Sequence, residues 1–233
     1  MKMVRLVGVL ALLVVVVPIL MIREQGHFQE IPEEVIKKVR PLGDFQGRVL
    51  AMEFVSDKSD IDNILGPDVA YNRGIMEKVL TIDFVWIGCY GSLFAAISLL
   101  LMRRRCPWAR YLGFVTLVAG LASAAFDVRE NMKILEVMKS YDQHVVNQVN
   151  DAALLKWTLG FVTIALLAIA FQDLANRFAN WISIGFTVVA VIGFIGLWRY
   201  PLLRFVGIPL LLTLILLAIT ALFWPHKLKE NTC

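Results

Sequence analysis

The sequence has few charged residues. Asp, Glu, Lys and Arg make up 18% of its 233 residues, whereas 58% are hydrophobic. A water-soluble domain of this composition would leave too much apolar surface uncovered, so the shortage of charge excludes an ordinary soluble protein. The mean hydropathy of +0.69 points the same way. The sequence therefore predicts an integral membrane protein whose main partner is the lipid bilayer.

Cysteine and catalytic motifs are also scarce. The three cysteines, Cys89, Cys106 and Cys233, are not placed to pair with one another and have no zinc-type spacing. The chain lacks G-x-S-x-G, H-E-x-x-H and a phosphate-binding glycine loop. No disulfide framework and no particular cofactor are indicated, and an enzymatic activity is not favoured.

The apolar stretches lack the alternation of polar and apolar residues that a membrane β-barrel requires. They are continuous, and a helix needs about 20 such residues to cross about 30 Å of hydrocarbon. Six stretches have a suitable length: 4–22, 79–102, 109–126, 153–171, 181–198 and 202–224. We therefore expect an all-α bundle of six transmembrane helices, in which small residues such as Gly113 and Gly120 permit close helix packing.

Lys2 and Arg5 precede the apolar core of the first stretch, as in a signal peptide, but no small-x-small cleavage site follows that core. We interpret residues 1–22 as an uncleaved transmembrane anchor. Residues 23–78 would then form an extracytoplasmic loop of short helices that acts as a cap. Residues 79–233 would form a transmembrane bundle of the remaining five helices.

Orientation follows from the basic residues in short loops, which are retained in the cytoplasm. The segment "RRRCPWAR", residues 103–110, carries four arginines and is the strongest such signal. It predicts that both termini are cytoplasmic, in an inner or plasma membrane. The basic excess is thus an orientation signal and gives no indication of nucleic-acid binding.

The connecting segments carry their own helix signals. In the first loop, "IPEEVIKKV" (residues 31–39) and residues 49–54 resemble short helices, and Ser59 is placed to cap a third helix over 60–65. Residues 132–157 contain neither glycine nor proline. We therefore expect the third span to continue as a helix to about Lys139, and the fourth helix to begin near Gln143.

A set of polar residues falls at one height in the predicted bundle. Asp83 lies inside the second span, and ionisable residues in a membrane need a partner or a wet cavity. Asp127, Glu130 and Asn131 share one side of the third helix, whereas Arg129 points elsewhere. The candidates for a ligand-binding site or an ion pathway are Asp83, Asp127, Glu130, Asn131, Lys156 and Tyr90.

These residues predict an outward-facing polar pocket in which Lys156 neutralises Asp83 or Asp127. Two simpler alternatives exist. Residues 127–131 could be a solvated helix end, or the ion pair of Lys156 with an aspartate could only hold the helices in register. The main hypothesis is a non-enzymatic membrane protein whose pocket binds a small ligand, a cation or a partner. Two further hypotheses are a proton- or cation-coupled transporter that uses Asp83 or Asp127, and an enzyme acting on lipid head groups with a metal held by Asp127 and Glu130.

A short internal similarity bears on the transporter hypothesis. Residues 105–113 and 199–207 share the pattern R-x-P-x-x-R-[YF]-[LV]-G. In the predicted topology the two segments lie on opposite sides of the membrane, as two inverted three-helix halves would place them. Inverted repeats are frequent in secondary transporters. Convergence is the alternative, because arginine, proline and an aromatic residue are each common where a helix leaves a membrane.

Overall fold

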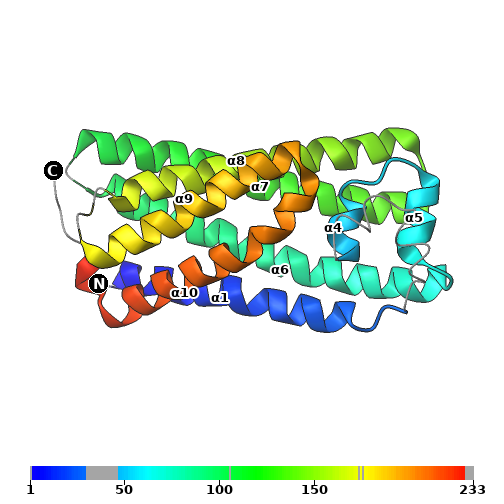
Figure 1. The fold of residues 1–233 in the computed structure, drawn as a ribbon, viewed down its shortest axis with the longest axis horizontal. Coiled ribbons are helices and arrows are strands. Elements are labelled where there is room, and N and C mark those ends of the chain that lie inside the picture. Colours follow the sequence, from blue (N-terminus) through cyan, green and yellow to red (C-terminus); the bar gives the residue numbers. More distant parts are fainter. Residues whose placement is uncertain (1, 30–46, 105, 173, 175, 229–233) are drawn as a thin grey trace. The chain divides into compact units, whose positions relative to one another are not determined.

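The computed structural model describes residues 2–29, 47–104, 106–172, 174 and 176–228, and within these residues it is helical and contains no strand (Figure 1). The all-α prediction is therefore confirmed for this part of the chain. The elements are α1 (Lys2–Gln25), α4 (Arg48–Met52), α5 (Lys58–Leu65), α6 (Val69–Met102), α7 (Pro107–Lys139), α8 (Gln143–Gln172), α9 (Arg177–Trp198), η1 (Tyr200–Phe205), α10 (Gly207–Phe223) and η2 (Pro225–Leu228). The short helix expected at 31–39 lies outside the described residues.

Five helices of the described chain are long and apolar enough to cross a membrane: α1, α6, α7, α8 and α9. They are compatible with a multi-pass membrane protein. Three of them exceed what a bilayer requires. The 34 residues of α6 extend for about 51 Å at 1.5 Å per residue, against about 30 Å of hydrocarbon.

The expected sixth span, 202–224, is interrupted in the structure. Its first residues belong to the 3-10 helix η1, and the α-helix that follows, α10, has only 17 residues. Proline explains where the break falls. Pro209 has no N–H to donate and is tolerated only in the first turn of an α-helix, so α10 begins just before it. At about 25 Å, α10 is shorter than the other apolar helices.

Most helix ends agree with the sequence. Helix α7 ends at Lys139 and α8 begins at Gln143, as predicted. The prediction of Ser59 as the cap of α5 was wrong. Asp57 is the cap, because its side chain accepts a hydrogen bond from the backbone N–H of Asp60 at 3.0 Å. The helix stops at Gly66, whose positive φ of 75° is a conformation that glycine adopts without a steric cost.

The chain divides into two compact units, which we call unit 1 and unit 2. Unit 1 comprises Met1–Val16, Gly88–Ala124 and Trp157–Cys233, and unit 2 comprises Val17–Ile87 and Ala125–Lys156. Helices α6, α7 and α8 are continuous, and each contributes one part to each unit.

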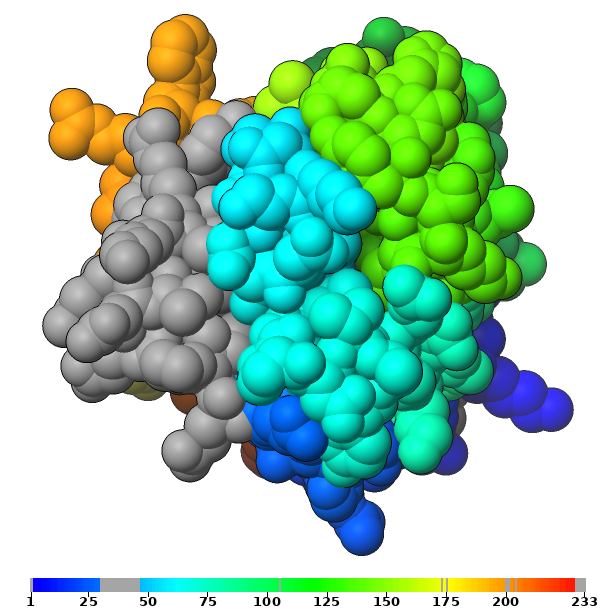
Figure 2. Space-filling model, turned by 90° about the vertical axis from the view of Figure 1, so that its right-hand side faces the viewer, coloured from blue at the N-terminus to red at the C-terminus, as the bar shows by residue number. Residues whose placement is uncertain are grey.

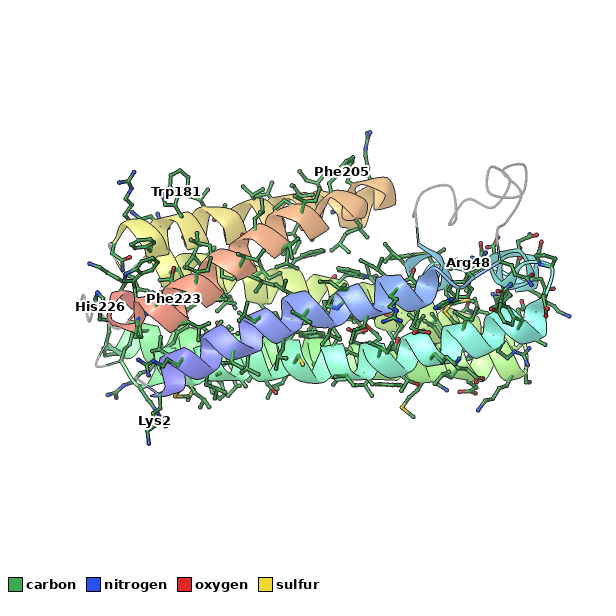
Figure 3. The ribbon with its side chains drawn as sticks, turned by 90° about the horizontal axis from the view of Figure 1, so that it is seen from below. Lys2, Arg48, Trp181, Phe205, Phe223 and His226 are labelled. Atoms are coloured by element: carbon green, nitrogen blue, oxygen red, sulfur yellow. The ribbon has the colours of Figure 1, made fainter. Side chains whose placement is uncertain are left out.

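Glycine permits close helix packing in unit 1. A Cβ atom added to Gly113 would lie 2.8 Å from the carbonyl oxygen of Ser98, and one on Gly120 would lie 2.9 Å from Cβ of Phe94. These distances confirm the predicted role of both glycines. In the α9–η1–α10 segment, the aromatic side chains of Trp181, Phe205 and Phe223, which are labelled in Figure 3, are exposed.

The two similar segments of the sequence have different backbones. Pro107 starts the α-helix α7, whereas the second segment forms the 3-10 helix η1. Their last glycines differ as well. Gly113 is in close helix contact, but a Cβ on Gly207 would meet nothing within 4 Å. The similarity in sequence is therefore not matched by a similarity in local structure.

In unit 2, the segment 47–66 packs against the long helices. Its apolar side chains, among them Ala51, Met52 and Ile64, are fully buried. Gln143 Nε2 donates to the carbonyl oxygen of Ser56, and Asn150 Nδ2 donates to that of Val55, each at 3.0 Å. Figure 2 shows this segment (cyan) lying against the green end of α7 and the start of α8. The segment is thus a bound part of unit 2.

Arg48, labelled in Figure 3, fixes the start of this segment. Its guanidinium donates to the carbonyl oxygen of Ile64 at 3.2 Å and lies 4.5 Å from the centre of the Phe28 ring. Partial burial lowers the pKa of Arg48 from its usual value. The contacts join α4, α5 and the residues after α1 within one unit.

Candidate functional site: a buried acid cluster

Six polar side chains from four segments of unit 2 are buried together, and we call them the acid cluster. Helix α6 contributes one, α7 three and α8 one, and the sixth follows α4. Their exposed fractions are 6% for Glu53, 6% for Asp83, 3% for Asp127, 0% for Glu130, 1% for Asn131 and 8% for Lys156. Five of the six are residues that the sequence singled out.

The spacing on α7 explains why three members come from one helix. Asp127, Glu130 and Asn131 lie at i, i+3 and i+4, which places them on one side of the helix. That side faces the interior of unit 2, whereas Arg129 is exposed. These three residues are therefore buried and do not form a solvated helix end.

Lys156 lies at the centre of the acid cluster. Its Nζ atom lies 2.9 Å from Glu53 Oε1, 3.2 Å from Asp127 Oδ1 and 2.9 Å from Glu130 Oε2. An ammonium group has three protons to donate, and three carboxylates surround it. The contact with Asp127 is one of the two pairings that the sequence predicted.

Asp83 has a different direct partner. Asn131 Nδ2 donates a hydrogen bond to Asp83 Oδ2 at 2.6 Å. The Lys156 ammonium makes its ion pairs with the three other carboxylates of the cluster. The amide of Asn131 therefore connects Asp83 to α7 without adding a charge.

The charges of the acid cluster do not balance. Counting only residues that the structure describes, it contains four carboxyl groups and one ammonium group, so full ionisation of these groups would give a net charge of 1 − 4 = −3. Like charges repel strongly where water is excluded, so gathering four carboxyl groups in one buried place favours the binding of positive charge. Chemically, this arrangement can accept protons or another small cation.

In the arrangement that the structure describes, the cluster is not a preformed metal site. In the part of the chain that the structure describes, no group of three or more His, Cys, Asp or Glu residues is placed to hold a metal ion. Asp127 and Glu130 instead contact the Lys156 ammonium, which occupies the space between them.

Tyr90, the remaining candidate, belongs to unit 1. There its buried ring packs edge-on against Phe94, with 5.6 Å between the ring centres. Tyr90 therefore lies in a different unit from the acid cluster and has a packing contact there.

Glu53 was missed by the sequence analysis. It lies in "AMEFV", where apolar residues flank a single acid within an otherwise polar segment. This pattern was a usable signal, because a charged residue among buried neighbours needs a partner. Its partner, Lys156, is 103 residues further along the chain (156 − 53), so local patterns could not identify the pair.

The chain matches no protein-family model, no curated protein and no solved structure. The interpretation of the acid cluster therefore rests on its own geometry and charge.

Proposed function

We propose that the protein is a non-enzymatic, multi-pass protein of an inner or plasma membrane that binds protons or another small cation at the acid cluster. The observation that carries the proposal is the Lys156 ammonium, which among the described residues is shared by three buried carboxylates, while a fourth buried carboxylate, Asp83, accepts a hydrogen bond from Asn131 of the same cluster. This excess of buried acid gives the cluster a chemical preference for cations.

In this proposal six segments cross the membrane, with α10 as the sixth and both termini in the cytoplasm. The arginine-rich loop between α6 and α7 supports this orientation. The segment 47–66 then lies on the outer side, and cations reach the acid cluster from there.

Glu53 provides the most direct route of access. It immediately follows the five-residue helix α4, whereas the other carboxylates are on helices of 33 or 34 residues. Short connecting segments open at a lower cost than long packed helices. Displacement of Glu53 would expose the Lys156 ammonium and the carboxylates behind it.

Infrared spectroscopy of the purified protein in detergent tests this proposal, because it detects protonated carboxyl groups directly. We expect such a signal at neutral pH, and we expect Asp83→Asn to reduce it. Asp151→Asn is the matched control, since Asp151 is exposed on α8 in the same unit. A wild-type protein with no protonated carboxyl group and no change in melting temperature on adding sodium or calcium would contradict cation binding.

A second candidate function is proton-coupled transport through Asp83. Two features of Asp83 favour it. Among the four carboxylates of the acid cluster, Asp83 alone makes no direct ion pair with Lys156, and it alone lies in the apolar part of a predicted span. An acid of this kind can exchange its proton without breaking the Lys156 contacts.

Proteoliposomes containing a trapped pH indicator would test transport. We expect a proton flux down an imposed gradient that Asp83→Asn abolishes and Asp151→Asn leaves unchanged. A wild-type flux no faster than that of empty liposomes, or an unchanged flux in Asp83→Asn, would reject Asp83 as the carrier.

A further inference from the structure

A second site lies in unit 2, apart from the acid cluster. A cavity of about 270 Å³ is bordered by α5, the first turns of α6 and the end of α7. Figure 2 shows the face of unit 2 on which these segments meet. None of its lining residues belongs to the acid cluster. The cavity therefore needs its own explanation.

The charge of the cavity is opposite to that of the acid cluster. Lys58, Arg73 and Lys139 line it, and Asp62 is its one acid, so its formal charge is 3 − 1 = +2. One basic residue from each of α5, α6 and α7 thus lines the same cavity. Such an arrangement attracts an anion and raises its local concentration.

Arg73 gives the strongest indication of a ligand. Its Nε atom is buried and has no hydrogen-bond partner among the described residues. A buried N–H without an acceptor is costly, and nearly all such groups are paired in native proteins. An oxygen of a bound anion would satisfy it. The planar guanidinium suits phosphate and carboxylate, to which it can donate two parallel hydrogen bonds.

The rest of the cavity suits an apolar group. Ile61, Leu65 and Met138 form part of its wall, and each is at most 4% exposed. The partly exposed ring of Tyr141 completes it at the end of α7, with its hydroxyl donating to Gln143 Oε1. The volume lies below the range of about 300–1,000 Å³ that is usual for drug-sized ligands, so the ligand must be small.

We propose that this cavity binds a small phosphate monoester with a short apolar chain. Its dianionic head would match the formal charge of +2 and would provide an acceptor for Arg73 Nε, while the chain would contact the apolar wall. This anion site goes beyond the cation binding proposed for the acid cluster and does not depend on it.

Titration calorimetry of the full-length protein in neutral-lipid nanodiscs tests the proposal with butyl phosphate as the probe. We expect saturable binding of butyl phosphate, weaker binding of inorganic phosphate and of hexanoate, and none of butanol. Arg73→Gln should weaken the binding of butyl phosphate at least about tenfold, since it removes a charge-assisted hydrogen bond. Arg129→Gln is the matched control and should bind as the wild type does, because Arg129 is exposed and does not line the cavity.

A second variant keeps the test decisive if Arg73→Gln does not fold. Lys139→Gln alters an exposed residue at the end of α7, and we expect a loss of severalfold in affinity without a change in melting temperature. Wild-type protein that binds none of the probes would overturn the proposal. So would tighter binding of hexanoate than of butyl phosphate, or wild-type affinity in both variants.

The same phosphate chemistry could come from a lipid head group. Nanodiscs that contain phosphatidic acid, itself a phosphate monoester, distinguish the two sources. If its head group occupies the cavity, butyl phosphate should bind more weakly in these nanodiscs than in neutral ones, and only in protein with Arg73 intact. If the ligand is a soluble molecule, the two affinities should agree. Both results support recognition of a phosphate monoester.

Discussion

Unit 1 and unit 2 use different interactions to hold helices together. In unit 1, helices meet at glycines, and a Cβ atom on Gly185 or Gly193 would overlap a neighbouring side chain. In unit 2, a charged network around Lys156 and hydrogen bonds to the backbone of segment 47–66 connect the helices. Helix association in unit 1 depends on close steric fit, whereas helix association in unit 2 depends on the pairing of polar groups.

The physical reasons for the two solutions differ. Lipid chains are as apolar as leucine, so helices in a membrane gain little from the hydrophobic effect and must gain from close contact. A buried charge, in contrast, costs several kcal/mol until it is paired. A change of one methyl group should therefore affect unit 1 most, and a change of one charge should affect unit 2 most.

The largest effect is expected for Lys156→Met. It keeps most of the side-chain volume but leaves three carboxylates without their shared cation. We expect the free energy of unfolding to fall by about 3–5 kcal/mol, the usual cost of breaking a buried ion pair. Denaturant titration in mixed micelles would measure it.

Lys133→Met is the matched control for this variant. Lys133 pairs with Glu136 at the surface of the same unit, where such a pair contributes about 0–1 kcal/mol. The loss in Lys156→Met should also shrink as the pH is lowered, because protonation removes the repulsion among the carboxylates. A loss as small as that of Lys133→Met would show that the acid cluster does not stabilise unit 2.

Asn131→Leu should have the next largest effect. It removes the amide that donates to Asp83 and leaves a buried carboxyl group without its direct partner. We expect a loss of about 1.5–3 kcal/mol in the free energy of unfolding. The double variant Asp83→Leu with Asn131→Leu should lose less than the sum of the single variants. Strict additivity would contradict a direct interaction between the two side chains.

Gly193→Ala tests unit 1. Its added methyl group would overlap the Phe161 ring, and overpacking of this kind costs about 1–3 kcal/mol. Gly88→Ala is the control, because a Cβ there meets nothing within 4 Å and alanine is the better helix former. The difference between their melting temperatures measures the contribution of close packing, and equal values would remove the contrast between the two units.

The smallest effect concerns the start of α5. Asp57→Ala removes the cap that accepts from the Asp60 N–H, so it should cost about 1 kcal/mol of unfolding free energy. Ser59→Ala should change it by less, since Ser59 is exposed and accepts from the side chain of Asn63 instead of capping a backbone N–H of the helix. A larger loss in Ser59→Ala than in Asp57→Ala would reverse the assignment of the cap.

Much of the fold was predictable because local patterns govern it. Long apolar stretches located the five long helices, and the absence of glycine and proline located the ends of α7 and α8. The break before α10 was missed, although Pro201 and Pro209 were visible. A hydropathy pattern does not separate these prolines from the apolar residues around them. In the backbone, however, proline has no N–H and cannot donate the hydrogen bond that a helix interior requires.

The acid cluster was predictable in part. The i, i+3, i+4 spacing of Asp127, Glu130 and Asn131 follows from helix geometry, as does a similar height for Asp83 and Lys156. The participation of Glu53 was not predictable. Nor was the pairing of Lys156 with Glu53, Asp127 and Glu130 while Asp83 pairs with Asn131. Whether Lys156 pairs with Asp83 or Asp127 depends on differences of a few ångströms that only the packing of side chains decides.

By itself, then, the sequence determined that this protein is built from long apolar helices and that certain acids share one side of α7, because both follow from the period of a helix and the composition of its faces. Only the tertiary structure decided that segment 47–66 brings Glu53 to Lys156 and that Arg73 lines a separate cationic cavity. Such contacts join residues far apart in the chain, and their partners are selected by packing and by the cost of leaving a buried charge unpaired.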